Sequence, residues 1–379
     1  MHFRQKTILL WLYLFWGFVQ LLILNRFGIV TRLEATKYIY EAEYFLKQGH
    51  FSQIKYIFYS LYIFLHVLSI KLGVEFIGIY ILQVTLNACA MLCLYRLSLR
   101  LTGDFGASNI AFILLTLCFP WQVWTTHLYT ESVFDSLIVI FSYSLIRAMD
   151  AGLKWRVLAI IFFVLLIFAR PTGILFVPVL ILLFGYKFLR AGKKLMALIT
   201  ILLPTIIFLV LLNFEMRGEG EFDFMKPFRE SQIICGVPEE FTNNLVLPKD
   251  GNNVQGLFYY IIHNPIHFSG LALKKIIYYF GMTRSYYSLP HNIYLIAFMY
   301  PIYLFAFAGL RGLKKLNKIY WAYSIFVIGI FAFSIILTCD DWLNRFVAPI
   351  MPFIVIAAAV GMKKSLHFIM GRGSAADIS

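Results

Sequence analysis

Acidic residues that lie beside apolar stretches are where this sequence could do chemistry. Glu34 comes first, because it opens the run LEATKYIYEAEYFLKQG a few residues after an apolar stretch ends. A carboxylate where a chain leaves a membrane can act as a general base at the lipid surface. Glu41 follows seven residues later and shares a helical face with Glu34, so it is a second candidate; the alternative is an acid on a solvated amphipathic helix.

Two further acids are candidates for the same role. Glu131 lies in HLYTES, at the start of an apolar run, where it could serve as an acid or base or simply favour the first turn of a helix. Asp341 lies in DDWLNRF, where Arg345 is near enough in sequence to pair with it. Both readings stay open for each residue.

Several basic residues could hold a phosphate near the same apolar boundaries. Arg170 lies in ARPTG between two apolar runs, and it could bind an anion or pair with Glu131. A polyanionic headgroup needs several cationic donors, and the predicted set is Arg170, Lys274, Lys275, Arg284 and Arg345.

Composition decides which elements must position these residues. Apolar residues make up 61% of the 379 residues and charged residues only 14%, which indicates a polytopic membrane protein. The runs are long and continuous rather than alternating, which predicts an all-α transmembrane bundle and excludes a barrel. We expect about ten spans, near 7–27, 76–96, 107–119, 131–148, 156–169, 172–189, 195–213, 292–310, 319–338 and 346–362.

Lys and Arg clusters predict the orientation. They fall before the first run and then after every second run, so both termini are expected in the cytoplasm. This distribution explains the net charge of +14 without nucleic acid as a partner. The predicted regions are therefore a module over 1–213 with a first outer loop at 28–75, an outer polar segment with an interfacial helix over 214–290, and C-terminal spans with a short tail over 291–379.

The stretch 54–72 is apolar enough to span but carries charges, and crossing would invert everything after it. We expect it to lie in the outer interface, with an extra span as the alternative. Whether Cys235 and Cys339 pair stays open. The sequence has no metal-ligand spacing, so we expect no cofactor; a divalent ion at Asp340 and Asp341 is the alternative.

The order of these motifs resembles the GT-C glycosyltransferases of the aminoarabinose-transferase and protein-mannosyltransferase type. Counterparts of that family's first outer loop are Glu34, Tyr38, Ala42 and Gly49, although the family's acid is usually Asp. KYIFYSLYIFLHVLSIKLG resembles its interfacial helix. PWQVWTTHLYTESVFDSL, ARPTGILFVPVLILL and RFVAPIMPFIVIAAAVG resemble its fourth-span start, Arg-Pro hairpin and last-span motif, the last with Phe346 where Tyr is commoner.

The resemblance implies a GT-C-like fold and a glycosyltransferase that moves a sugar from a polyprenyl-phosphate donor to a lipid-linked or glycan acceptor. Glu34 would be its base, and the cations would stabilise the leaving phosphate. The implied location is the bacterial inner membrane, among membrane lipids, with the site on the outer face. The alternatives are a surface-polysaccharide polymerase or ligase, and a lipid or glycan transporter of the flippase kind.

Overall fold

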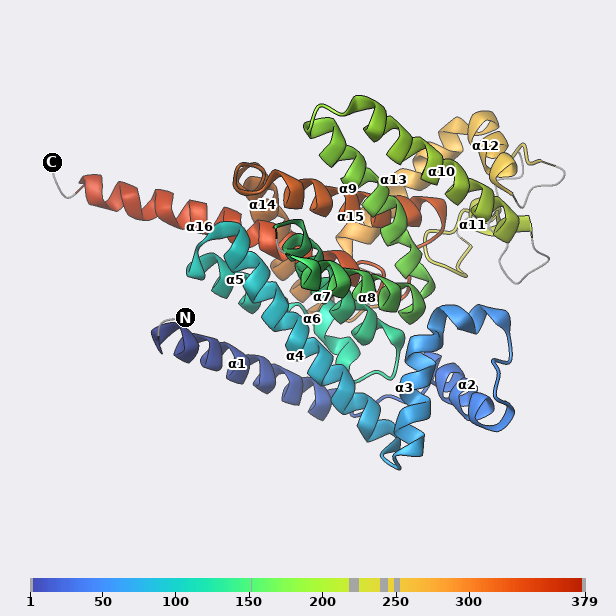
Figure 1. The fold of residues 1–379 in the computed structure, drawn as a ribbon, viewed down its shortest axis with the longest axis horizontal. Coiled ribbons are helices and arrows are strands. Elements are labelled where there is room, and N and C mark those ends of the chain that lie inside the picture. The colour runs from blue at the N-terminus through green and yellow to red at the C-terminus, as the bar shows by residue number, and fades with distance from the viewer. Residues whose placement is uncertain (1–2, 151, 218–224, 239–244, 249–252, 377–379) are drawn as a thin grey trace. The chain divides into compact units, whose positions relative to one another are not determined.

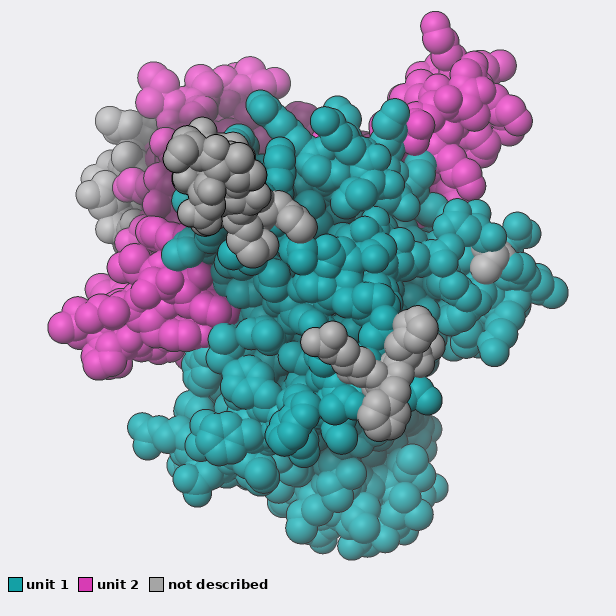
Figure 2. All heavy atoms as spheres, turned by 90° about the vertical axis from the view of Figure 1, so that its left-hand side faces the viewer, with its two compact units in different colours: residues 1–174, 301–320, 348–379 teal, residues 175–300, 321–347 magenta. Residues whose placement is uncertain are grey.

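The structure, a computed structural model, describes residues 3–150, 152–217, 225–238, 245–248 and 253–376. The described residues are almost entirely helical and contain two isolated β-bridges (Figure 1). They divide into two compact units, coloured separately in Figure 2: residues 1–174, 301–320 and 348–379 form unit 1, and residues 175–300 and 321–347 form unit 2.

Unit 1 begins with α1 (Phe3–Phe27), α2 (Glu34–Gln48), the 3₁₀ turn η1 (Ile54–Tyr59) and α3 (Ser60–Lys71). Next come α4 (Glu75–Thr102), α5 (Phe105–Leu117), α6 (Phe119–Gln122), η2 (Val123–Thr125), α7 (Thr130–Asp150) and α8 (Leu153–Ala169). After η3 (Pro171–Leu175) the chain enters unit 2, and it returns to unit 1 with the end of α14 (Leu289–Leu316), the start of α15 (Lys318–Leu337), η4 (Ala348–Ile350) and α16 (Met351–Ala376).

Helix α7 lies at the centre of unit 1. It packs against α4 and α8. In its most apolar stretch of 18 residues 78% are buried, compared with 22% in α1 and 33% in α4. A helix surrounded by other helices can carry polar side chains that lipid would not tolerate, and α7 carries Glu131 and Asp135. The fold therefore keeps these acids away from lipid.

A close helix crossing joins α14 to α16 in the same unit. A Cβ atom on Gly309 would lie 1.9 Å from the carbonyl oxygen of Ala357, and a Cβ on Gly361 would lie 2.0 Å from that of Phe305. Only glycine allows two backbones to approach so closely. These two glycines therefore set the spacing of the crossing.

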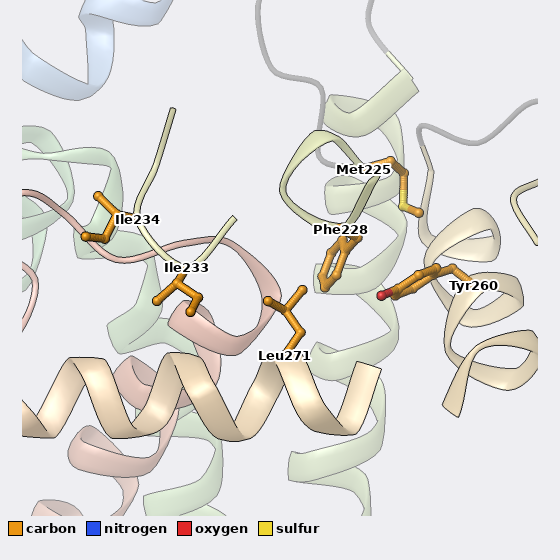
Figure 3. Close-up of a cluster of buried hydrophobic side chains, with 6 residues drawn as sticks. All are labelled: Met225, Phe228, Ile233, Ile234, Tyr260 and Leu271. Carbon is orange, nitrogen blue, oxygen red and sulfur yellow. The ribbon is translucent and has the colours of Figure 1, made fainter. Parts of the chain in front are cut away.

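Unit 2 contains α9 (Phe176–Arg190), α10 (Lys194–Arg217), α11 (Lys226–Arg229), α12 (Val254–His263), α13 (Pro265–Gly281) and the remaining parts of α14 and α15. A small core joins α11 to α12 and α13 (Figure 3). The rings of Phe228 and Tyr260 are in contact there, with centroids 5.0 Å apart and their planes tilted by 44°, and Leu271 of α13 lies beside them.

The predicted helical membrane fold is confirmed, because each of the ten predicted runs falls on a helix. Eight described helices are long and apolar enough to cross a membrane, or nine if the pair bent by 70° around Cys118 counts as one span. The eight include 54–71, while α8 has 17 residues and the apolar part of α10, 194–210, is also short. An interfacial place for 54–72 and a regional division at 213 and 290 remain predictions.

Candidate active site

Glu34 owes its position to a short extended segment that follows α1. Val30 donates its N–H to the carbonyl of Thr126 at 2.9 Å, and its own carbonyl accepts from Leu128 N at 3.0 Å. The Tyr129 hydroxyl then donates to the Arg32 carbonyl at 3.2 Å. These contacts tie the start of α2 to the segment that leads into α7, so Glu34 and Glu131 come from neighbouring segments of one unit.

The residue before Glu34 adopts an unusual backbone conformation. Leu33 has a φ of 58° and a ψ of −120°, a positive-φ conformation that L-residues rarely adopt. Such strain persists only where surrounding contacts hold it, and it is concentrated at functional sites. The turn at Leu33 sends the chain directly into α2, with Glu34 as its first residue.

The Glu34 carboxylate has a defined set of neighbours. Lys37 Nζ lies 2.9 Å from its Oε2, and the Tyr38 hydroxyl donates to the same oxygen at 3.3 Å. Lys37 also lies over the rings of Tyr38 and Tyr59, 4.8 and 5.2 Å from their centroids. The Glu34 side chain is 31% exposed, so a ligand can reach the carboxylate.

Tyr38 connects Glu34 to a buried charge pair. Burial raises the pKa of Tyr38 well above its usual value, and the negative charges of Glu131 and Glu34 raise it further, while Arg170 opposes them. Tyr38 is therefore within electrostatic reach of all three. The phenol donates a hydrogen bond to Glu34, and its electrostatic interactions extend to Glu131 and Arg170.

Glu131 and Arg170 form an ion pair inside unit 1. Arg170 Nη1 lies 3.0 Å from Glu131 Oε1, and both side chains are buried. Arg170 is extended because it precedes Pro171. Its carbonyl accepts from Gly173 N at 2.8 Å, and a Cβ on Gly173 would lie 2.2 Å from the Leu166 carbonyl oxygen. The pairing that the sequence left open for Arg170 is therefore present.

Asp135 lies one helical turn beyond Glu131 and was missed by the sequence analysis. It is buried, it feels the charges of Arg170 and Glu131, and neither carboxylate oxygen has a hydrogen-bond partner among the described residues. The available signal was its four-residue spacing from Glu131 within an apolar run.

The Glu41 carboxylate is engaged in hydrogen bonds within the protein. It is fully buried and accepts hydrogen bonds from the Ser52 backbone N–H at 2.6 Å and from Ser52 Oγ at 2.5 Å. These bonds fasten the turn between α2 and η1. A carboxylate with both oxygens engaged in this way is poorly placed to reach a substrate.

The remaining predicted residues lie in unit 2, around residues 338–346, which we call the 338–346 loop. Asp341 Oδ2 lies 2.8 Å from Arg345 Nε; Asp341 is buried and Arg345 is partly exposed. Next to them, Arg284 Nη2 lies 2.5 Å from Asp340 Oδ2 in a fully buried pair. Asp341 and Arg345 therefore pair as the alternative reading proposed, and Arg284 has an acidic partner 56 residues away.

The adjacent lysines Lys274 and Lys275 differ completely. Lys274 is exposed, whereas Lys275 is buried and donates to the carbonyls of Ile336, at 3.2 Å, and Thr338. Burial lowers the pKa of Lys275 to about 7, and burial also raises the pKa of Asp340 to about 6 although Arg284 opposes that rise. The side chains of Lys275 and Arg284 are thus occupied within the protein.

Cys235 and Cys339 form a disulfide, which settles the pairing that the sequence left open. The bond joins the polar segment after α11 to the 338–346 loop. Beside it, Cys235 N donates to the Asp340 carbonyl at 2.9 Å, and Asp340 N donates to the Ile233 carbonyl at 2.7 Å.

Metal ligands do not cluster in the part of the chain that is described: no group of three or more His, Cys, Asp and Glu residues there could hold an ion. Whether an ion assists at Asp340 and Asp341 stays an open alternative.

Comparison with known proteins identifies no family. No family model matches the sequence, and no curated protein matches it. Among solved structures, the crystal structure of ArnT from Cupriavidus metallidurans in the apo state aligns with a TM-score of 0.45 and 12% identity. The alignment covers 93% of this chain and 59% of that one. A likeness this distant carries no inference about activity.

Proposed function

We propose that this chain is a membrane glycosyltransferase of the GT-C type that moves a sugar from a polyprenyl-phosphate donor to a lipid-linked or glycan acceptor at the outer membrane face. The observation that carries the proposal is the environment of Glu34. This acid opens a helix after a strained turn, is held by Lys37 and Tyr38, and stays accessible to a ligand.

Glu34 suits the role of base better than the other candidates. Glu41 is locked to Ser52, and Glu131 is buried against Arg170. Asp341 is largely covered and paired with Arg345. A general base must come within hydrogen-bond reach of the proton it removes, so accessibility decides among these acids.

The proposed reaction is an inverting displacement. Glu34 accepts the proton of the acceptor hydroxyl or amine, and the acceptor atom bonds to the anomeric carbon while the bond from that carbon to the phosphate oxygen breaks. The polyprenyl phosphate leaves with the bonding electron pair. Charge grows on this phosphate in the transition state, so a fixed cation beside it lowers the barrier.

Two of the predicted phosphate ligands in unit 2 have accessible side chains. Lys274 is exposed and Arg345 is partly exposed, whereas Lys275 and Arg284 are buried in internal contacts. In unit 1, Arg170 is engaged by Glu131, so we assign it to orienting that acid.

The test is transfer of radiolabelled sugar from a panel of polyprenyl-phosphate sugars by purified protein. We expect transfer by the wild type and its loss in Glu34→Gln, which keeps the shape of the side chain and removes the base. Glu43→Gln is the matched control, because Glu43 is an exposed acid on the same helix. Unchanged transfer in a folded Glu34→Gln protein would refute Glu34 as the base.

A transporter is the second candidate, and Asp135 favours it. A buried acid without a hydrogen-bond partner within a spanning helix is typical of proteins that move ions or lipids through a membrane. Movement of a fluorescent lipid-linked sugar across proteoliposomes, lost in Asp135→Asn, together with no sugar transfer from any donor, would establish this alternative.

A further inference from the structure

The C-terminal half of α13 grips the 338–346 loop. Lys275 Nζ donates to the carbonyls of Ile336 and Thr338, and the Tyr279 hydroxyl donates to the Phe346 carbonyl at 3.1 Å. Lys275 and Tyr279 are four residues apart on one face of the helix, and both are fully buried. One helix face therefore contacts both ends of the loop.

Lys275 satisfies backbone carbonyls at the C-terminal end of α15. The last carbonyls of a helix have no partner within the helix, and they carry partial negative charge. Helix α15 ends at Leu337, so the carbonyls of Ile336 and Thr338 belong to that end. The amine of Lys275 satisfies both and lies 4.6 Å from the ring centroid of Phe228. A buried side chain with these contacts has no route to an external ligand.

The residues after α13 continue the grip. Met282 accepts a hydrogen bond from Asn344 Nδ2 at 2.6 Å, and Arg284 pairs with Asp340. The hydroxyls of Tyr286 and Tyr287 both donate to the Trp342 carbonyl, at 2.7 and 2.8 Å. The contacts thus run along the whole loop.

Contacts with Cys235 fix the loop as well. Cys339 is bonded to Cys235, and the Trp342 indole N–H donates to the Cys235 carbonyl at 3.1 Å. With both edges held, Arg345 and its partner Asp341 are presented from a backbone that has little freedom to move. Preorganised charges stabilise a ligand at lower cost than flexible ones.

We propose that Lys275 and Arg284 are positioning residues, which hold the 338–346 loop so that Arg345 meets the phosphate of a lipid-phosphate ligand. This inference rests on the proposed function, and it gives two of the five cations predicted from the sequence a different task. The amine of Lys275 is bonded to carbonyl groups and the guanidinium of Arg284 to Asp340, so both residues act on the ligand only through the geometry of the loop.

The test combines hydrogen exchange with ligand binding in the purified full-length protein. In Lys275→Met we expect the amides of residues 338–346 to exchange faster by about tenfold or more, since one hydrogen bond to the loop and one to the end of α15 are lost. Binding of farnesyl phosphate, the probe, should weaken in parallel. Tyr279→Phe removes one hydroxyl at nearly constant volume, and it should give a smaller effect of the same kind.

Two comparison variants separate positioning from direct contact. Lys274→Met removes the same charge one residue away and should leave exchange in the loop at the wild-type rate. Arg345→Met should weaken binding of farnesyl phosphate with little change in exchange at Cys339 and Asp340. Weaker binding in Lys275→Met without faster exchange would mean that Lys275 touches the ligand, and it would overturn the inference.

The proposed function fails separately from this inference. If the wild-type protein does not bind farnesyl phosphate, the assignment of a lipid-phosphate ligand is refuted. The exchange rates then still decide whether Lys275 holds the loop, because they are measured without ligand.

Discussion

Breaking the buried ion pair of Glu131 and Arg170 should destabilise unit 1 strongly, and the loss of free energy should depend on which partner is replaced. Glu131→Gln keeps the shape of the side chain but leaves the guanidinium of Arg170 without its bonded carboxylate. Removing one partner of a buried ion pair costs about 3–5 kcal/mol, because the other charge stays desolvated.

The interaction of Asp135 with Arg170 and Glu131 determines which end of this range of about 3–5 kcal/mol each variant reaches. Its carboxylate is close enough to feel Arg170, so it partly compensates that charge in Glu131→Gln, and we expect a loss of about 3 kcal/mol. Arg170→Met instead removes the cation that interacts with both Glu131 and Asp135. We expect that variant to lose about 5 kcal/mol.

The assay is equilibrium unfolding in mixed micelles as the mole fraction of sodium dodecyl sulfate rises, with the free energy of unfolding extrapolated to zero. Combining Glu131→Gln with Asp135→Asn removes the compensation, so the pair of changes should cost more than the sum of the single changes. A loss below about 1 kcal/mol in both Glu131→Gln and Arg170→Met would refute the reasoning, since exposed ion pairs behave in that way.

Two further predictions concern other parts of the fold. Burial lowers the pKa of Lys275 from its ordinary value of 10.5 to about 7 in the folded protein, so between these pH values the unfolded chain binds a proton that the folded chain releases. The free energy of unfolding should therefore increase from pH 7 to pH 9, by at most about 1.4 kcal/mol per unit, and the increase should vanish in Lys275→Met. Gly309→Ala should lower the free energy of unfolding by about 1–3 kcal/mol, because the added methyl group would collide with the Ala357 carbonyl. Gly329→Ala, where a Cβ meets no atom within 4 Å inside α15, is the matched control and should keep or slightly raise the free energy of unfolding.

Hydropathy predicted the helices of this chain well because lipid restricts what can cross it. A spanning segment must satisfy its backbone hydrogen bonds internally, so each long apolar run had to be a helix. The bend at Cys118 has a cause in the sequence, since Pro120 lies two residues later and cannot continue the preceding helix. Local rules were sufficient for these features.

Contacts between distant segments were beyond such rules. Arg284 and Asp340 are 56 residues apart, and nothing in either local sequence selects the other as a partner. The fate of Lys275 was closer to prediction, because Leu271, Lys275 and Tyr279 recur every four residues and so share one face. Counting Lys274 and Lys275 together as phosphate ligands overlooked that adjacent helical residues point about 100° apart.

Burial, more than residue type, separates the roles of the acids in unit 1. Four acids of this unit have the same functional group in different surroundings. Glu34 pairs with a lysine and is partly exposed to solvent, Glu41 is bonded to a serine, and Glu131 pairs with an arginine. Asp135 has no hydrogen-bond partner among the described residues. A carboxylate fastened at both oxygens acts on the fold, and one that is accessible can act on a substrate. The strained turn at Leu33 sets Glu34 apart, since it brings an acid to the first position of a helix instead of into its packed face. If Glu34→Gln abolishes transfer while Glu41→Gln chiefly loosens the turn at Ser52, exposure of the carboxylate will have distinguished the catalytic base from the structural acid on the same helix.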